Sequence, residues 1–211
     1  MTADLDSTRR LLDAAANIIA NGGFATLTIE SLARKAGIPS EQVYAEYSSV
    51  EPILVLMLNR EFTSIYMEIV DHIERDPRGG KLSRIYYYTL AAVYERPLAR
   101  VLYTIDPEAM NSIMRSANSM GYVPGVGIRT DLIEKMQRLG MVRRSVDATT
   151  VSYMLSVFSA GLALTAPHDD IDRVVRGITD LLGQVVDENV EDTLPGKRAF
   201  YDWALSLADK R

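Results

Sequence analysis

The chain contains no cysteine and only two histidines, His72 and His168, which lie far apart in its 211 residues. The lack of cysteine excludes thiol catalysis and Cys-ligated zinc, and two isolated histidines argue against a histidine metal cluster or a Ser-His-Asp triad. The sequence also lacks a phosphate-binding glycine loop and an HExxH motif. We therefore expect a protein that is not an enzyme and that needs no cofactor or metal.

Long apolar runs are scarce. The N-terminal residues include acidic side chains and no apolar run, so they do not have the pattern of a signal peptide. The stretch 148–167 carries no charge, but serines and threonines are scattered through it, which favours a buried helix over a membrane span. We expect no membrane partner and a cytoplasmic location. The net charge of −5 means that the overall field does not assist DNA binding.

Strand signals are also nearly absent, and apolar residues recur at helical spacing along the chain, which predicts an all-α fold. Asp76–Gly80 has the composition of a linker. Helices are expected at about 6–21, 29–36, 39–47, 50–75, 82–95 and 97–104, then at 107–139 with a break at 121–127, and finally after 147, near 169 and after 196.

The second and third helices are both short and are joined at Gly37, the pattern of a helix-turn-helix motif. Leu32 is expected in the core and Ala33 where the two helices cross, while Ile38 and Val43 complete a small core. Such a core holds the third helix outward, in a position to enter a major groove.

Residues 9–62 contain a series of short blocks at characteristic spacings. These blocks are Leu12–Ala16, Gly23-Phe24, Thr28-Ile29, Leu32-Ala33, Ala36–Ile38, Val43-Tyr44, Tyr47, Ser49 and Glu51–Leu54. In these blocks and in the gaps between them, the segment resembles the DNA-binding domain of the TetR family of bacterial transcriptional regulators. The resemblance implies a helix-turn-helix domain at 1–50, a helical ligand-binding and dimerisation domain at 51–211, and a homodimer that binds operator DNA.

By carry-over from the family, Tyr44 and Thr28 contact the DNA backbone, and Ser40 and Gln42 face base edges. Glutamine pairs with adenine, and a glutamate accepts a hydrogen bond from the amino group of cytosine. Glu41 is therefore either a specificity residue or a solvated helix position that weakens binding. Two further candidates are either backbone contacts or an ordinary solvated first turn: Arg9 and Arg10.

The expected DNA-binding domain is unusually acidic. Residues 1–50 hold four basic side chains against six acidic ones, a net charge of −2, and the third helix has no lysine or arginine. Glu46 and Val50 depart from the family, which usually has His or Tyr at the first position and a phosphate-binding Lys at the second. Because lysine and arginine contacts supply most nucleic-acid affinity, weak binding is expected.

The second half of the chain is rich in tyrosine and methionine, which suits a pocket for a small apolar or aromatic organic ligand. The resemblance implies such a pocket among the fourth to eighth helices and a dimer interface on the eighth and ninth. The candidate pocket residues are Tyr86, Tyr103, Met110, Met114, Tyr122 and Phe158. The candidate interface residues are Met154, Leu155, Phe158, Ile178 and Leu182.

The predicted function is that of a ligand-responsive DNA-binding transcriptional regulator, a repressor, that acts as a homodimer. One alternative stays open, because the third helix is acidic and Val50 replaces a lysine. In that alternative the chain is a TetR-like ligand- or partner-binding protein whose helix-turn-helix no longer binds DNA.

Overall fold

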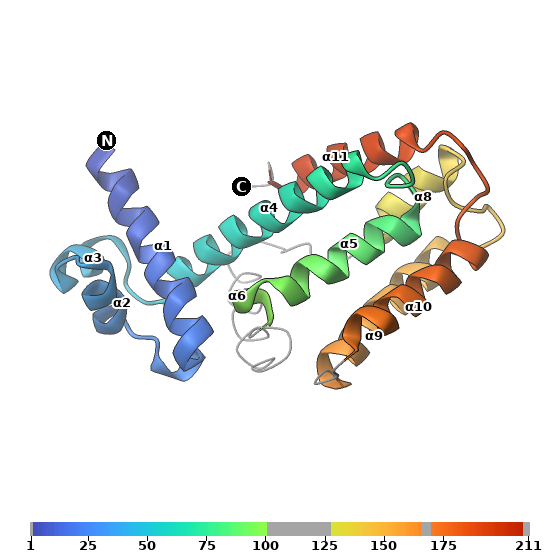
Figure 1. Cartoon of the computed structure of the whole chain (residues 1–211). Helices are drawn as coiled ribbons and strands as arrows, with labels where there is room; N and C mark the ends of the chain where they lie inside the picture. Colours follow the sequence, from blue (N-terminus) through green and yellow to red (C-terminus); the bar gives the residue numbers. More distant parts are fainter. Residues whose placement is uncertain (1, 101–127, 166–169, 209–211) are drawn as a thin grey trace. The chain divides into compact units, whose positions relative to one another are not determined.

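The computed structural model describes residues 2–100, 128–165 and 170–208 (Figure 1). In these ranges every regular element is a helix, which confirms the predicted fold class. Contacts within the chain define two compact units that divide inside α4, between Phe62 and Thr63. The predicted domain boundary between residues 50 and 51 falls at the first residue of α4.

The first unit contains the helix-turn-helix motif. Leu12, Ile19, Leu32 and Val43 are buried in its core, as the apolar spacing of the first three helices predicts. Its described elements are α1 (Thr2–Gly22), the 3-10 helix η1 (Phe24–Thr26), α2 (Ile29–Ala36), α3 (Ser40–Glu46), the first part of α4 (Glu51–Arg75) and α6 (Pro97–Arg100).

The turn between α2 and α3 forms for local reasons. Gly37 closes α2 in the left-handed conformation, at φ 66° and ψ 39°, which glycine adopts without steric cost. The N–H of Ile38 then donates to the carbonyl of Ala33 at 3.0 Å. Pro39 precedes α3 as its N-cap rather than forming its first residue, with φ −58°. The predicted helix-turn-helix is therefore confirmed, with one residue of difference at the proline.

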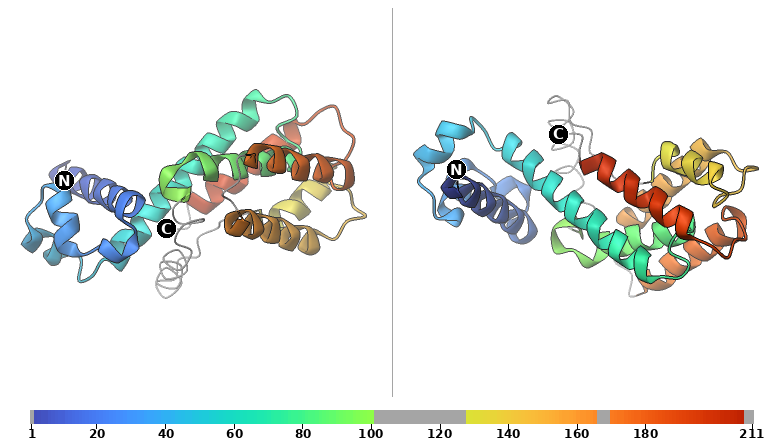
Figure 2. Two further views of the ribbon diagram at one scale, coloured as in Figure 1. Left: turned by 60° about the horizontal axis from the view of Figure 1, so that its bottom comes forward. Right: turned by 90° about the horizontal axis from the view of Figure 1, so that it is seen from above.

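The second unit is a set of packed helices, and Figure 2 shows α11 running beside the C-terminal half of α4. The ring of Trp203 on α11 meets that of Tyr66 on α4 edge to face, with the centroids 5.6 Å apart. The described elements of this unit are the part of α4 from Thr63, α5 (Leu82–Glu95), α8 (Thr130–Arg138), α9 (Ala148–Thr165), α10 (Ile171–Val185) and α11 (Leu194–Ala208).

Three consecutive tyrosines on α5 point to three different neighbours. Tyr86 is buried and donates to the carbonyl of Leu155 on α9 at 2.8 Å. The hydroxyl of Tyr87 donates to Asp172 on α10 at 3.3 Å, and that of Tyr88 donates to Asp76 at 3.1 Å. Because successive helical residues are about 100° apart, only one of the three faces the core.

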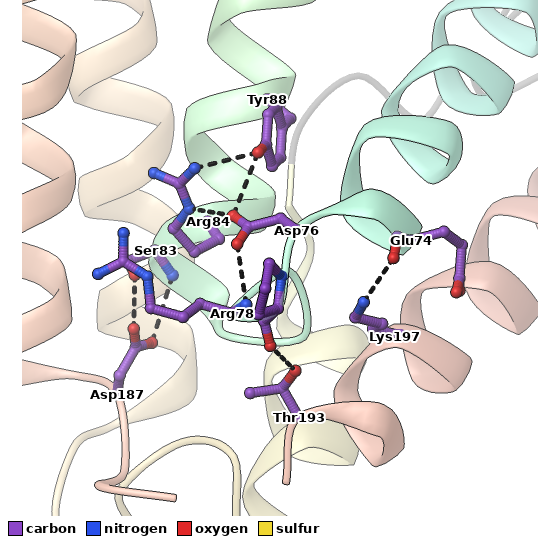
Figure 3. Close-up of polar contacts among 10 residues, drawn as sticks. Glu74, Asp76, Arg78, Ser83, Arg84, Tyr88, Asp187, Thr193 and Lys197 are labelled. Carbon is purple, nitrogen blue, oxygen red and sulfur yellow. Dashed lines mark hydrogen bonds and ion pairs between the residues drawn. The ribbon is translucent and has the colours of Figure 1, made fainter. Parts of the chain in front are cut away.

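The predicted linker Asp76–Gly80 is a closely packed turn, which Figure 3 shows between α4, α5 and α11. A Cβ atom added to Gly80 would lie 1.8 Å from the carbonyl oxygen of Thr193, so only glycine fits there. Thr193 in turn donates from its hydroxyl to the carbonyl of Pro77 at 2.8 Å, and Lys197 Nζ donates to that of Glu74 at 2.8 Å. This turn anchors the start of α11.

Some helix ends differ from the sequence prediction. The first helix begins at Thr2 rather than near residue 6, and α11 begins at Leu194, ahead of the Pro195-Gly196 pair. Proline is tolerated there because the first turn of a helix leaves N–H groups unpaired. The stretch 121–127, predicted as a break, lies outside the described residues. In the described part of the chain, no helix has the combination of length and apolar character that a membrane span requires.

Candidate functional site

We call α2 and α3, with the turn at Gly37, the reading head. Val43 faces the core and is buried, and this fixes the rotation of α3 about its own axis. Glu41, Gln42 and Tyr44 are exposed around the rest of α3, and Ser40 is half-buried in the first turn. The candidates for base and phosphate contact on α3 are therefore accessible, or partly accessible, on the part of the helix that Val43 does not bury.

Thr28 is the N-cap of α2. Its hydroxyl oxygen accepts from the N–H of Ser31 at 3.1 Å, and the hydroxyl oxygen of Ser31 accepts from the N–H of Thr28 at 2.9 Å. This reciprocal capping box satisfies two N–H groups and fixes the start of the helix. The side chain of Thr28 therefore has a structural role, and the residue remains exposed.

Tyr44 is bonded within the reading head. Its hydroxyl donates to Oε1 of Glu30 at 2.5 Å, which links α3 to the first turn of α2. Hydrogen bonds from Tyr44, from the N–H of Glu30 itself and from Thr28 lower the pKa of Glu30. The hydrogen bond to Glu30 raises the pKa of Tyr44. The pair is a phenol and a carboxylate at neutral pH.

The two arginines of α1 are also engaged with neighbours. Arg9 donates to Asp6 at 2.7 Å, and Arg10 approaches the same carboxylate at 3.5 Å. Arg10 also donates to the carbonyl of Ala36 at 3.3 Å, at the C-terminal end of α2. Arg10 therefore braces the turn of the reading head, while the side chains of both arginines remain largely exposed.

Two cations that sequence reasoning left out of the candidate site lie on α2. Arg34 and Lys35 are exposed, and within the described residues neither has an ion-pair partner. They line a shallow groove of about 390 Å³ together with Ile18, Thr26 and Ser31. The spacing of Glu30 and Arg34 indicates an ordinary ion pair along the helix, but Glu30 contacts Tyr44 instead.

The acidic residues of α3 lie where the sequence predicts them. So does Val50, which stands where the TetR family usually has a lysine. Glu41 and Glu46 are exposed at the two ends of α3. Val50 directly precedes α4, and its carbonyl accepts from the N–H of Leu54 at 3.0 Å. The position is half-buried, so a longer side chain at residue 50 can extend from the start of α4 into solvent.

Only two of the six predicted pocket residues lie in the described part of the chain. Phe158 is half-buried on α9. Tyr86 is buried, and its hydroxyl contacts both the carbonyl of Leu155 and, at 3.0 Å, Oγ of Ser159. Burial raises the pKa of Tyr86 to about 12. The predicted residues outside the described ranges are Tyr103, Met110, Met114 and Tyr122.

The predicted dimer residues divide into two groups. Leu155 and Leu182 are buried in their own unit, so they are not available to a partner, whereas Met154 is exposed and Ile178 and Phe158 are half-buried. On α10 a face with Val175, Thr179 and Leu182 is buried, and so is Val186 directly after the helix. Exposed apolar side chains remain elsewhere on α9 and α10, namely Tyr153, Val157, Val174, Leu181 and Val185.

No family model matches the chain, and no curated protein sequence matches it. Several solved structures are similar to the chain. A TetR-family regulator from Haemophilus influenzae is 14% identical, with a TM-score of 0.59 over 89% of this chain and all of that one. SmeT, the repressor of the SmeDEF multidrug efflux pump of Stenotrophomonas maltophilia, is 17% identical, with a TM-score of 0.59 over 90% of this chain and 96% of its own.

A complex of SmeT with triclosan is also similar, at 14% identity and a TM-score of 0.59 over 88% of this chain and 94% of that one. These matches cover nearly the full length of both partners. The chain therefore has the fold of TetR-family transcriptional regulators, with an N-terminal helix-turn-helix followed by a helical domain.

Proposed function

We propose that the chain is a ligand-responsive DNA-binding transcriptional regulator, a cytoplasmic repressor that acts as a homodimer. The observation that carries this proposal is the reading head, in which the turn at Gly37 and the buried Val43 leave a polar face of α3 exposed. A short helix presented in this way fits the width of the major groove. The fold shared with TetR-family regulators supports the same function.

Specific roles on DNA follow from the positions of the side chains. Gln42, Glu41 and Ser40 would contact base edges, because they form the first turn of α3 and are exposed or half-buried there. Tyr44 and Thr28 would contact the sugar-phosphate backbone at the junction of α3 and α2. Further backbone contacts would come from cations, and we assign these to Arg9, Arg10, Arg34 and Lys35.

The exposed apolar side chains of α9 and α10 support a dimer. Leu181 is 64% exposed and Val157 is 67% exposed, and several exposed apolar side chains on the same two helices are a feature of protein interaction surfaces. Interfaces of permanent dimers resemble a protein core divided in two. We place the interface on Met154, Val157, Ile178, Leu181 and Val185, with Phe158 at its edge, rather than on the buried Leu155 and Leu182.

The ligand proposed is a small apolar or aromatic organic molecule bound in the second unit. SmeT, which has a similar fold, binds triclosan. The helix α4 contributes residues to both compact units. A ligand that changes the position of α4 would therefore change the position of the reading head. Such a ligand acts by its different affinity for the DNA-binding and the free conformations.

A second candidate function has its own supporting observation. The reading head carries a net negative charge, and Tyr44 already donates to Glu30. A TetR-like protein with these features would serve as a ligand- or partner-binding protein without an operator. The two candidates differ in one measurable property, which is sequence-specific binding to DNA.

The experiment is an electrophoretic mobility shift with the full chain and the DNA upstream of its own coding sequence. We expect a shift that survives competition by unrelated DNA of equal length and that is lost in Gln42→Ala. A candidate ligand is expected to raise the melting temperature of the chain and to release the DNA. Equal competition by related and unrelated DNA would favour the second candidate, whereas a specific shift that is unchanged in Gln42→Ala would reject only the base contact assigned to Gln42.

A further inference from the structure

The carboxylate of Glu30 accepts a hydrogen bond from the hydroxyl of Tyr44, which is the group that the reading head would offer to a DNA phosphate. Tyr44 on α3 donates to Glu30 at 2.5 Å, and both side chains are exposed on the side where α2 and α3 meet. One carboxylate therefore engages the tyrosine hydroxyl that is expected to contact the DNA backbone at this junction.

Glu30 is well placed to remain charged. It lies in the first turn of α2, where the partial positive charge of a helix N-terminus favours an anion. A hydrogen bond with one ionised partner is shorter and stronger than a neutral one, so the contact with Tyr44 is not a weak surface bond. In the free protein the hydroxyl of Tyr44 therefore already donates to an anion, the carboxylate of Glu30.

A DNA phosphate brought to the same junction would compete with the carboxylate. A tyrosine hydroxyl has one proton to donate, so Tyr44 cannot serve Glu30 and a phosphate at the same time with full strength. If Tyr44 turns to the phosphate, Glu30 loses a hydrogen bond and faces a second negative charge. Both effects oppose binding.

We propose that Glu30 is an affinity-limiting residue of the reading head, which acts as an internal competitor of the DNA phosphate for Tyr44. The proposal depends on the proposed binding to DNA and adds a role that the family resemblance does not assign. Glu30 acts through Tyr44 and is therefore a positioning residue. In the wild-type chain the hydroxyl of Tyr44 contributes little to DNA affinity, because it exchanges one anionic acceptor for another.

A double-mutant cycle tests this role with four full-length chains: the wild type, Glu30→Gln, Tyr44→Phe and the double variant. Binding is measured by fluorescence anisotropy on a random-sequence duplex and on the upstream DNA. Glu30→Gln is expected to tighten binding to both duplexes by about fivefold per reading head, the effect of one unit charge near a phosphate in a water-like medium. Tyr44→Phe should change wild-type affinity by less than about twofold but weaken Glu30→Gln several-fold.

Glu46→Gln is the matched control, since it removes the same charge from the reading head. Glu46 and Tyr44 are two residues apart on α3 and do not face each other. We expect no coupling between Glu46→Gln and Tyr44→Phe. A second readout is the pKa of Tyr44 itself, followed by NMR of labelled tyrosine, which should fall in Glu30→Gln.

The outcomes separate this role from the proposed function. If Tyr44→Phe weakens the wild type as much as it weakens Glu30→Gln, Tyr44 reaches the phosphate unhindered and the role of Glu30 is rejected. Equal affinity of the wild type and Glu30→Gln rejects it as well, while DNA binding stands. If none of the four chains binds DNA, the proposed function fails, and the role of Glu30 fails with it.

Discussion

Asp187 receives two hydrogen bonds from a single residue, Ser83. The N–H of Ser83 donates to one carboxylate oxygen at 3.2 Å and its hydroxyl donates to the other at 2.5 Å (Figure 3). Ser83 lies in the first turn of α5, whereas Asp187 follows the C-terminal end of α10, and both are buried. Asp187 thus caps a helix that is distant in sequence, and it joins two segments of the second unit.

We predict that Asp187→Ala lowers the free energy of unfolding by about 1–3 kcal/mol, because it leaves a buried N–H and a buried hydroxyl without an acceptor. Asp187→Asn keeps one acceptor oxygen and should cost less. Urea unfolding of the three chains measures both values. A stability of Asp187→Ala equal to that of the wild type would show that the cap does not hold α5.

The contribution of Asp187 to the free energy of unfolding should depend on pH in one direction. Burial raises the pKa of Asp187, and the hydrogen bonds from Ser83 only partly oppose the shift. A raised folded-state pKa means that the stabilisation is complete below the unfolded pKa of about 3.9 and declines as the pH rises through the folded pKa. We expect the stability of the wild type relative to Asp187→Asn to fall as the pH rises above the unfolded pKa of about 4.

Asp147 is a control whose contribution to stability should change with pH in the opposite direction. Hydrogen bonds from the side chain and the N–H of Thr150 lower the pKa of Asp147 at the start of α9. Its contribution is therefore present above the unfolded pKa and is lost as the pH falls through the folded pKa. The stability of the wild type relative to Asp147→Asn should rise with pH. Slopes of the same sign for both aspartates would contradict the assignment.

Leu181→Glu should convert a dimer into a monomer. Leu181 is exposed in the protomer, so a glutamate there is tolerated by the fold but would be buried without a partner in the interface. Leu139→Glu, at an exposed leucine after α8, is the control and should remain dimeric. Light scattering gives the masses. A wild-type monomer at micromolar concentration, or a dimer unaffected by Leu181→Glu, rules this interface out.

Val50→Lys should restore a missing phosphate contact. Each such contact contributes about one unit to the slope of log affinity against log salt concentration, so a dimer should gain about two units and bind any duplex more tightly. Titrations at several salt concentrations give the slope. Glu46→His should tighten binding by removing a carboxylate. Tight wild-type binding at physiological salt that Val50→Lys leaves unchanged would mean that the start of α4 does not contact phosphate.

The variant Glu41→Gln distinguishes recognition of a base by Glu41 from repulsion of the DNA backbone by its charge. If Glu41 accepts a hydrogen bond from cytosine, its loss should relax the preference at one base pair per half-site, by about 1–3 kcal/mol. If it only repels the backbone, affinity should rise while the sequence preference is unchanged. Binding to a set of duplexes with single substitutions in each half-site measures both quantities in one series.

Local features were predictable from the sequence and tertiary contacts were not. The turn at Gly37 between two short helices is a short-range pattern, and it was predicted correctly. The bond between Tyr44 and Glu30 joins residues of two helices, and the sequence gives no direct signal for it. The spacing of Glu30 with Arg34 even indicates a different partner.

The apolar stripe of α10 illustrates a second limit. Helical spacing predicts that its apolar residues share a broad face, but it does not show which of them have a partner within the protomer. Leu182 faces inward and is buried, while Leu181, its neighbour in sequence, is exposed. Asp187 carried no signal at all, because it follows the helix in a segment without periodicity.

The most direct test of the central claim is selection of duplexes from a random DNA pool by the full-length chain and by the double variant Val50→Lys, Glu46→His. If the reading head recognises an operator, both chains should enrich one sequence with two symmetric half-sites about one helical turn apart. The double variant should retain more of that DNA at physiological salt. If neither chain enriches any sequence, the reading head does not recognise DNA and the proposed regulator function is contradicted.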